Sequence, residues 1–445
     1  MTIRAQVAEA LNDAGLQSTG FSERGQGSWP SAFAVSDLAV ASVGTVCSEL
    51  ASLSGRDDPV VIDRRLASLW CDLTIQPQGW ALPPVWDDLA GIYQARDGFI
   101  RLHTNVPHHK AAALRALGVA AGRETVEAAV AGWDAEALEA AIVKENGCAA
   151  RLMSLTDWRA HPQGRAVNAE PLITWSQSGK ADAVWSPGPP DRLLAGLKVL
   201  DLTRVLAGPV CTRTLAGFGA DVLRIDPPGW SEPLVEMEVT PGKRLSTLDL
   251  KTEPGRDCFL ELLSQADVFV HGYRNGALET LGLGEDIRRA TNPEVIDIAL
   301  NAYGWTGPWS HRRGFDSLVQ MSSGIAHHGM DWKGADRPVP LPVQALDFAT
   351  GYLMTATVLR AIRIRTKIGA VLTARLSLAR TSALLASVPA DNDGSAFKPL
   401  AESDLSTDLE QTDWGPARRI RFPADQAMGW SIPARRLHSD AASWP

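Results

Sequence analysis

Apolar and polar positions follow a regular order along the second half of the chain. The runs KVLDLT, DVLRID, DVFVHGY and EVIDIALNAYG, between residues 198 and 304, are apolar and β-branched, and they predict buried strands. Helical periodicity between these runs predicts helices over about 210–218, 254–265 and 277–290. Strands that alternate with helices are typical of βαβ units, so we expect an α/β architecture with a parallel sheet.

The first half shows a different pattern. Residues 30–54 predict a helix capped by Ser36 or Asp37, and IYQARDGFIRLHT predicts a hairpin that turns at Asp97-Gly98. Ala-rich helices are expected over about 109–142, and the Pro-, Gly- and Ser-rich stretch 160–192 is typical of a linker. We therefore expect three regions, namely residues 1–190, a second domain over 191–385, and a return or wrapping tail over 386–445.

An internal repeat relates the two halves. SDLAVASVGTVCSELASL aligns with LDFATGYLMTATVLRAIR at an offset of 310 residues, which pairs Asp37 with Asp347. The same offset pairs Arg65 with Arg375, in the strand-like segment that follows each helix. Short Ala-rich helices align easily by chance. A register that continues without a gap through the next strand nevertheless favours duplication.

Composition narrows the classes of partner. The 43 Lys and Arg residues against 51 Asp and Glu give a net charge of −8 without a dense basic cluster, so we expect no nucleic acid partner. Five scattered cysteines without CxxC spacing argue against disulfides and against a zinc site. No uninterrupted apolar run reaches membrane-spanning length, and the amino terminus lacks the pattern of a signal peptide. We expect a cytoplasmic protein with no membrane partner and no metal.

Residues 195–382 resemble the class III CoA-transferases, the family of formyl-CoA transferase, carnitine CoA-transferase and the α-methylacyl-CoA racemases. The blocks that carry the resemblance include LAGLKVLDLTRVLAGPVCTRTLAGFGADVLRIDPP, ADVFVHGYRNGALETLGLG and VQALDFATGYLMTATVLRAI. The resemblance implies a large domain with a Rossmann-like parallel sheet and a smaller α+β domain. Residues 30–165 resemble the carboxy-terminal half of the family, including its small domain, so the halves are rearranged or duplicated relative to the usual order.

The resemblance also implies an activity, an acyl-CoA:carboxylate CoA-transferase of the EC 2.8.3 type. In this family the residue that matches Asp347 is the nucleophile, which carries CoA as an aspartyl thioester from an acyl-CoA to a second carboxylic acid. Acyl-CoA and a carboxylic acid are then the substrates, and no cofactor is held permanently. The positions that match, or adjoin, the CoA-contacting residues of the family are Arg204, Leu206, Ala207, Arg224, Lys251, Tyr273 and Arg274.

Taken without the family, Asp347 precedes a long apolar helix and is predicted to be an N-cap, with a pKa held down by the helix amino end. Asp37 is predicted to be a structural cap only. The oxyanions of the reaction need donors, for which backbone N–H groups near Gly324 or at the start of the helix that carries Asp347 are candidates. His108 and His109 lack a Cys or acidic partner at metal spacing and are expected at the surface.

Two other functions stay open. A CoA-thioester racemase or isomerase is disfavoured because Phe315 stands where the racemases have a His, although His311 or His327 is able in principle to approach the site. A non-catalytic CoA-binding subunit is compatible with the rearranged halves and with Pro227 at a position that is often basic. Because members of this family form interlaced dimers, we expect a homodimer; a monomer that pairs its own two halves is the alternative.

Overall fold

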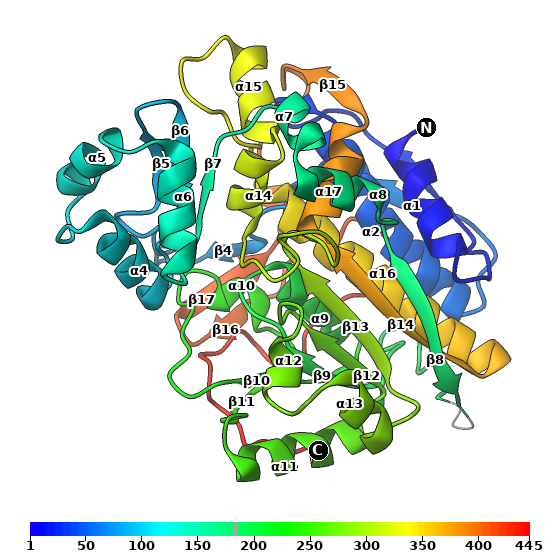
Figure 1. Cartoon of the computed structure of the whole chain (residues 1–445). Helices are drawn as coiled ribbons and strands as arrows, with labels where there is room; N and C mark the ends of the chain where they lie inside the picture. Colours follow the sequence, from blue (N-terminus) through cyan, green and yellow to red (C-terminus); the bar gives the residue numbers. More distant parts are fainter. Residues whose placement is uncertain (182–184) are drawn as a thin grey trace.

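A seven-stranded sheet forms the centre of the computed structural model, which describes residues 1–181 and 185–445 (Figure 1). Its strand order is β11-β10-β9-β12-β13-β14-β8. The first six strands run parallel, and the edge strand β8 pairs antiparallel with β14. The four strands predicted between residues 198 and 304 are confirmed. The bounds are β8 Thr174–Lys180, β9 Lys198–Leu202, β10 Asp221–Asp226, β11 Lys243–Thr247, β12 Val268–His271, β13 Ile296–Asn301 and β14 Ala370–Ser377.

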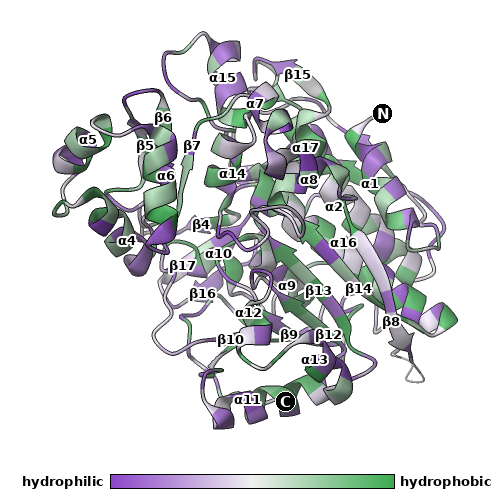
Figure 2. Ribbon diagram, viewed as in Figure 1, coloured by the Kyte–Doolittle hydropathy of each residue, from purple (hydrophilic) through white to green (hydrophobic). Residues whose placement is uncertain are grey.

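Both faces of this sheet are covered by helices, because its strands are apolar on both sides. Val199 of β9 packs with the helices of one face, while its neighbour Leu200 packs with Phe259 and the helices of the other. Figure 2 shows the contrast between the hydrophobic β13 and the paler, more hydrophilic edge strand β8. The first face carries α9 (Ala207–Gly217) and α16 (Ala345–Ile368), and the second carries α11 (Glu253–Ser264), α12 (Ala277–Thr280) and α13 (Glu285–Thr291).

A small α+β unit lies to one side of the large sheet (Figure 1, cyan). Its three antiparallel strands enclose an apolar core with three helices, as the hairpin and the Ala-rich pattern predict. Its elements are β5 (Gly91–Gln94), β6 (Phe99–Leu102), β7 (Ala149–Arg151), α4 (Pro107–Leu117), α5 (Arg123–Ala131) and α6 (Ala135–Lys144). The elements that connect it to the large sheet are α7 (Leu155–Ala160), α8 (Pro162–Ala169), α14 (Asp316–Ser322), α15 (Ile325–Lys333) and α17 (Leu378–Ala386).

The two copies of the repeat begin their elements in the same register. Helix α2 (Val35–Leu53) begins 310 residues before α16, and β3 (Val60–Asp63) begins 310 residues before β14. Each of the two strands pairs in parallel with an earlier strand, β3 with β1 (Phe21–Arg24) and β14 with β13. The two helices also pack against each other, and Glu49 of α2 accepts hydrogen bonds from Arg360 and Arg363 of α16 at 2.7 Å each. These matched elements support the duplication.

Two local predictions are wrong. The stretch 160–192 is not only a linker, since it contributes α8 and the strand β8, whose hydrogen bonds come from β14 rather than from any apolar pattern of its own. Helix α2 is capped neither by Ser36 nor by Asp37, because it begins at Val35 with Ala34 as its N-cap. The division of the chain near residue 190 stays a prediction, and one apolar cluster contains residues from both sides of it.

The last segment of the chain runs along the large sheet and ends near α11 (Figure 1, red). Trp444 donates a hydrogen bond to the Leu262 carbonyl, and Trp430 donates one to the Arg213 carbonyl. In the described part of the chain, no helix is long and apolar enough to span a membrane. The remaining elements are α1 (Ile3–Asn12), β2 (Ser31–Phe33), α3 (Arg64–Leu69), β4 (Ile75–Pro77), α10 (Glu236–Val239), β15 (Pro389–Asn392), a 3-10 turn (Glu402–Asp404), β16 (Glu410–Thr412) and β17 (Gly415–Arg419).

Candidate active site

Asp347 lies at the amino end of α16, where this helix meets the amino end of α9. It is the third residue of the helix, after the N-cap Gln344, and is only 8% exposed. A Cβ added to Gly351, one turn later, would lie 2.5 Å from the Ala207 carbonyl oxygen, so glycine permits the close approach of the two helices. Thr355, a further turn along, donates to the Cys211 carbonyl at 3.4 Å. The helices therefore run parallel, with both positive amino ends beside Asp347.

A second carboxylate, Asp316 at the start of α14, lies beside Asp347. Its Oδ2 accepts a hydrogen bond from the backbone N–H of Asp347 at 2.9 Å, and its Oδ1 accepts one from the Gln320 amide at 2.5 Å. The side-chain amide oxygen of Gln320 in turn accepts a hydrogen bond from the backbone N–H of Leu341 at 2.7 Å. The carboxylate of Asp347 accepts no hydrogen bond from any residue in the described ranges. Asp316 is therefore held in place, whereas the Asp347 oxygens are left for a ligand.

This arrangement reverses the pKa expected for Asp347. Burial, and then the negative charge of Asp316, raise the pKa of Asp347 well above its ordinary value. Burial also raises the pKa of Asp316 to about 6, against the hydrogen bonds from Gln320 and from the amino end of α16. The prediction that the helix amino end holds the pKa of Asp347 down is wrong, because Asp316 takes that hydrogen bond and adds a like charge.

The small α+β unit supplies the other side of the site. Along β6, alternate side chains face opposite ways: Ile100 lies in the small core, whereas Phe99 packs with Leu318 of α14. Arg101 faces the same way as Phe99 and is only 8% exposed. Its positive charge lowers the pKa of Asp316, so its guanidinium lies near that carboxylate. His103 follows the strand and lies on the ring of Phe315, with ring centroids 3.8 Å apart.

Histidines of this unit are more buried than the sequence predicts. His109 is buried, and its Nε2 lies 3.6 Å from the Cys148 sulfur, so its placement at the surface is wrong; His108 is exposed as expected. Burial lowers the pKa of His103, and likewise that of His109, to about 3, which keeps both imidazoles neutral. Neither His311 nor His327 faces the two carboxylates, since one contacts the Asn275 carbonyl and the other pairs with Asp331.

The predicted CoA-contacting residues fall into two groups. Arg204 and Tyr273 are together: the guanidinium donates to the tyrosine hydroxyl at 2.8 Å and lies between that ring and the ring of Trp230. Leu206 and Ala207, buried at the start of α9, follow them towards Asp347. Lys251 and Arg274 are exposed on the loops after β11 and β12. The loop before α9 also holds Val205 at φ 68°, a strained value for a β-branched residue and one that is found mostly at functional sites.

Arg224 does not join either group. Its side chain is fully buried and forms ion pairs with Asp226 at 2.8 Å and with Glu232 at 2.5 Å. A fully buried guanidinium that donates to Asp226 and also forms an ion pair with Glu232 has no exposed face for a phosphate. In this conformation Arg224 stabilises the strand and the loop that follows it, and its predicted contact with CoA lacks support.

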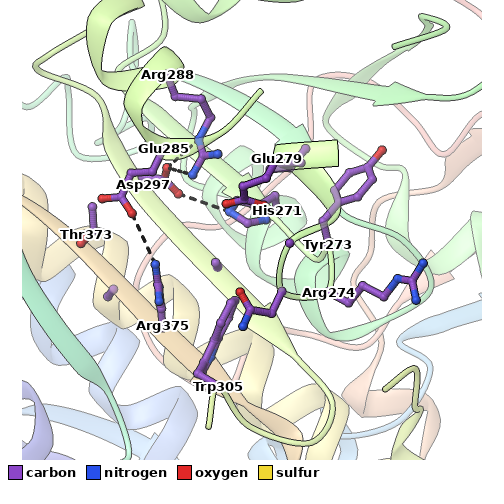
Figure 3. Close-up of a pocket in the computed structure, with 15 residues that line it drawn as sticks. His271, Tyr273, Arg274, Glu279, Glu285, Arg288, Asp297, Trp305, Thr373 and Arg375 are labelled. Carbon is purple, nitrogen blue, oxygen red and sulfur yellow. Dashed lines mark hydrogen bonds and ion pairs between the residues drawn. The ribbon is translucent and has the colours of Figure 1, made fainter. Parts of the chain in front are cut away.

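Two cavities of the chain differ in their relation to this site. A cavity of about 40 Å³ lies beside Tyr273 and Arg274, over strands β12, β13 and β14, and holds a few water molecules at most (Figure 3). Asp297 lies in it between Arg288, at 2.8 Å, and His271, at 3.5 Å. A larger cavity of about 760 Å³ lies under the last segment, and none of the predicted site residues lines it. Among the described residues, no group of three or more His, Cys, Asp or Glu is arranged to hold a metal ion.

Comparison with known proteins identifies a family match in the second half of the chain. Residues 194–405 match CoA-transferase family III. The match confirms the family resemblance seen in residues 195–382 of the sequence. The residues before 194, which resemble the other half of the family, lie outside it, so their assignment stays a prediction.

The individual relatives below match only part of this chain and only part of their own length. An acyl-CoA transferase of Fusarium pseudograminearum is 31% identical, over 47% of this chain and 50% of its own. A succinyl-CoA:glutarate CoA-transferase of Homo sapiens is 35% identical, over 40% of this chain and 44% of its own. The crystal structure of Rv3272 from M. tuberculosis is 32% identical over 45% of this chain and 57% of that chain, with a TM-score of 0.42. The chain spans about half the length of the curated relatives that it matches first.

Sequence reasoning did not assign a role to two residues of the site. Asp316 was visible only as the last member of the Gly314-Phe315-Asp316 triplet, and its contact with Asp347 joins residues 31 positions apart. Arg101 had a weaker signal, namely a charged residue inside the apolar strand FIRL. Only the tertiary fold brings both of them to the amino end of α16.

Proposed function

We propose that this chain is an acyl-CoA:carboxylate CoA-transferase, with Asp347 as its nucleophile. The observation that supports it best is a buried carboxylate without a hydrogen-bond partner in the described chain, beside the amino ends of α9 and α16. It lies in the segment that matches CoA-transferase family III. A carboxylate held this way suits covalent catalysis, because its oxygens are not engaged before substrate arrives.

The proposed reaction has four balanced steps. The Asp347 carboxylate attacks the thioester carbon of an acyl-CoA, which forms a mixed anhydride and releases the CoA thiolate. The thiolate attacks the Asp347 carbonyl, so the first acid leaves as a carboxylate and an aspartyl-CoA thioester remains. The carboxylate of the second acid attacks this thioester and again releases the thiolate. The thiolate then attacks the new acyl carbon, which frees Asp347 and yields the new acyl-CoA.

Asp316 and the helix amino ends have distinct roles in this proposal. The charge of Asp316 disfavours the ionised form of Asp347, so converting that carboxylate into a neutral ester-like group relieves the repulsion. The pair thus favours the covalent intermediate over the free nucleophile. The amino ends of α9 and α16 place positive potential where the oxyanion develops, although the N–H of Asp347 itself is taken by Asp316.

Arg204 and Tyr273 are proposed CoA contacts whose side chains the fold brings within hydrogen-bond distance of each other. The remaining contacts proposed on the same family basis are Leu206, Ala207, Lys251 and Arg274, while Arg224 acts in our proposal only through the loop that it anchors. We propose CoA as a substrate rather than a resident cofactor. A homodimer and a cytoplasmic location remain part of the proposal, and light scattering tests the first of them.

The test is chemical trapping with two matched variants. Asp347 and Asp37 hold the same position in the two copies of the repeat, so Asp347→Asn and Asp37→Asn are the same change in two environments. Wild-type protein incubated with a panel of acyl-CoAs and then with hydroxylamine should show a modified Asp347 by mass spectrometry. Asp347→Asn should abolish the adduct and CoA transfer, and Asp37→Asn should leave both within about twofold, because its surface ion pair with Arg64 is worth little.

Other outcomes would change the assignment. Loss of transfer in Asp37→Asn alone would make the amino-terminal copy catalytic. Full transfer in both variants would refute the covalent mechanism. Exchange of the substrate α-proton with deuterated solvent, without transfer, would favour the racemase alternative, for which His103 on Phe315 is the imidazole at hand. Binding of CoA without either reaction would favour a non-catalytic subunit.

A further inference from the structure

Arg101 is a buried cation without an anionic partner at hydrogen-bond distance. Its side chain forms no hydrogen bond and no ion pair within the described ranges, and its Nε is buried and unpartnered. The guanidinium lies over the ring of Trp86, with its central carbon 4.5 Å from the ring centroid. Burial lowers the pKa of Arg101 to about 10, opposed in part by the charge of Asp316. A buried charge in this state carries a desolvation cost that no contact of the chain offsets in full.

The other deeply buried arginines show how unusual this is. Arg213 forms an ion pair with Glu238, Arg224 with Asp226, and Arg360 with Glu49. Each of these guanidinium groups has a carboxylate within the chain. Arg101 has the burial of a structural arginine but lacks its partner, so an anion from outside the chain is the group that fits it.

The position of Arg101 indicates which part of a ligand it meets. Its charge affects the pKa of Asp316, whereas the pKa of Asp347 is raised by burial and by Asp316 alone. Arg101 also faces the same way along β6 as Phe99, which packs with Leu318 of α14, so the guanidinium lies on the side of the site that carries Asp316. An anion on Arg101 and a thioester carbon on Asp347 are then two ends of one substrate, which passes Asp316 and the ring of Trp86.

We propose that Arg101 binds the terminal carboxylate of a dicarboxylic acyl group, and so selects dicarboxylic acids over monocarboxylic acids as substrates. This inference rests on the proposed function. A guanidinium presents two parallel N–H groups that match both oxygens of a carboxylate. A carboxylate on Arg101 also supplies the counter-charge that the folded chain lacks.

The reacting carboxylate is the other anion that needs to be considered. A strong ion pair on that group would stabilise it before attack and lower its reactivity. If Arg101 held the reacting group, its loss would slow all acids equally. If it holds the terminal group, its loss slows dicarboxylic substrates only.

The test compares succinyl-CoA with butyryl-CoA, which have the same chain length and differ in the terminal carboxylate. The readout is the second-order rate constant for formation of the Asp347 adduct, that is, the rate constant divided by the acyl-CoA concentration, measured by trapping under single-turnover conditions. The variants are Arg101→Met, which removes the charge, and Arg101→Lys, which keeps the charge without the paired N–H groups. Arg96→Met is the control, because Arg96 lies on the same hairpin with its side chain 62% exposed.

The wild type and Arg96→Met should favour succinyl-CoA by about 100-fold, the scale of a buried charge-assisted pair. In Arg101→Met the ratio of the rate constants for succinyl-CoA and butyryl-CoA should fall close to one, because only the reaction of succinyl-CoA becomes slower. The ratio in Arg101→Lys should lie between those of the wild type and Arg101→Met. Arg101→Met should also unfold at the same denaturant concentration as the wild type or a higher one, because it removes an unpartnered buried charge. These results would support the proposal.

Equal wild-type rates with both acyl-CoAs would overturn the inference about Arg101 while the CoA-transferase proposal stands. A uniform loss with both in Arg101→Met would also overturn it, and would assign Arg101 to the reacting carboxylate. Absence of any adduct in the wild type, with a wide panel of acyl-CoAs, would overturn the proposed function and this inference with it.

Discussion

The pair formed by Asp316 and Asp347 should make the protein less stable as the pH rises. Both carboxyls are buried, and both have a pKa above the ordinary value. A raised pKa means that the folded state prefers the protonated form more than the unfolded state does. The stabilisation is therefore complete below the unfolded pKa of about 3.9, and it is lost as the pH rises through the folded values. Replacing both residues by Asn should remove this dependence.

Asp316 sets the minimum size of the effect. Its folded pKa of about 6, against about 3.9 in the unfolded chain, corresponds to about 3 kcal/mol in total, most of which is lost between pH 4 and pH 8. About half of that change falls between pH 5 and pH 8 for a group with these two values. Asp347 contributes in the same direction, because burial and the charge of Asp316 both raise its pKa. The total should therefore exceed the contribution of Asp316.

The assay is urea denaturation of the wild type and of the Asp316→Asn/Asp347→Asn double variant at several pH values. The quantity of interest is the change with pH in the difference between their free energies of unfolding, because hydrogen bonds lost through substitution contribute equally at every pH. Between pH 5 and pH 8 the double variant should gain at least about 1 kcal/mol over the wild type. A flat difference, or one of opposite sign, would refute the electrostatic account of the pair.

Two further predictions concern other charged groups. Arg204→Ala and Arg274→Ala should each weaken CoA binding by about 1 to 3 kcal/mol in calorimetry, while Arg224→Ala should mainly lower stability, since that side chain is buried between carboxylates. Unchanged affinity for CoA in both Arg204→Ala and Arg274→Ala would contradict a CoA site at the loops that follow β9 and β12. Glu49→Gln should lower the free energy of unfolding by about 3 to 5 kcal/mol in urea, because it leaves Arg360 and Arg363 without their buried carboxylate. A loss below about 1 kcal/mol would contradict the docking of α2 on α16 through this group.

Four strands of the large sheet, β9, β10, β12 and β13, could be predicted because burial on both faces leaves an apolar run in the sequence. Val268 to His271 and Ile296 to Asn301 are buried throughout, and each run matches its strand. Strand β8 carries no such signal, since residues 174–180 read TWSQSGK and four of them are exposed. It is held by hydrogen bonds to β14, and sequence patterns do not report that kind of pairing. The predicted helix over 277–290 was likewise divided, with Gly282 and Gly284 between α12 and α13.

In the candidate site, too, features carried by the local sequence could be predicted and features that depend on tertiary contacts could not. Asp347 could be found because its motif is local, and the family match covers it. Its charge state could not be inferred locally, because a helix amino end favours the anion only while its N–H groups stay free. Asp316 occupies one of them from another helix, and burial adds to the effect. Arg101 comes from residues outside the matched segment, so neither the motif nor the match pointed to it.

The two copies of the repeat hold an Asp at the same helix position in different surroundings, so they show how the surroundings determine its exposure and its charge partners. Asp37 and Asp347 are each the third residue of their helices, and both helices follow an N-cap with nearly the same backbone angles. Asp37 is half exposed and pairs with Arg64 at 2.8 Å, so its charge is already neutralised by the chain. Asp347 is buried, faces a second carboxylate, and has no cation at hydrogen-bond distance in the described chain. The same local structure therefore yields a solvated ion pair in one copy and a buried carboxyl group without a cation partner in the other, and only the second has oxygens free for the proposed attack on a thioester.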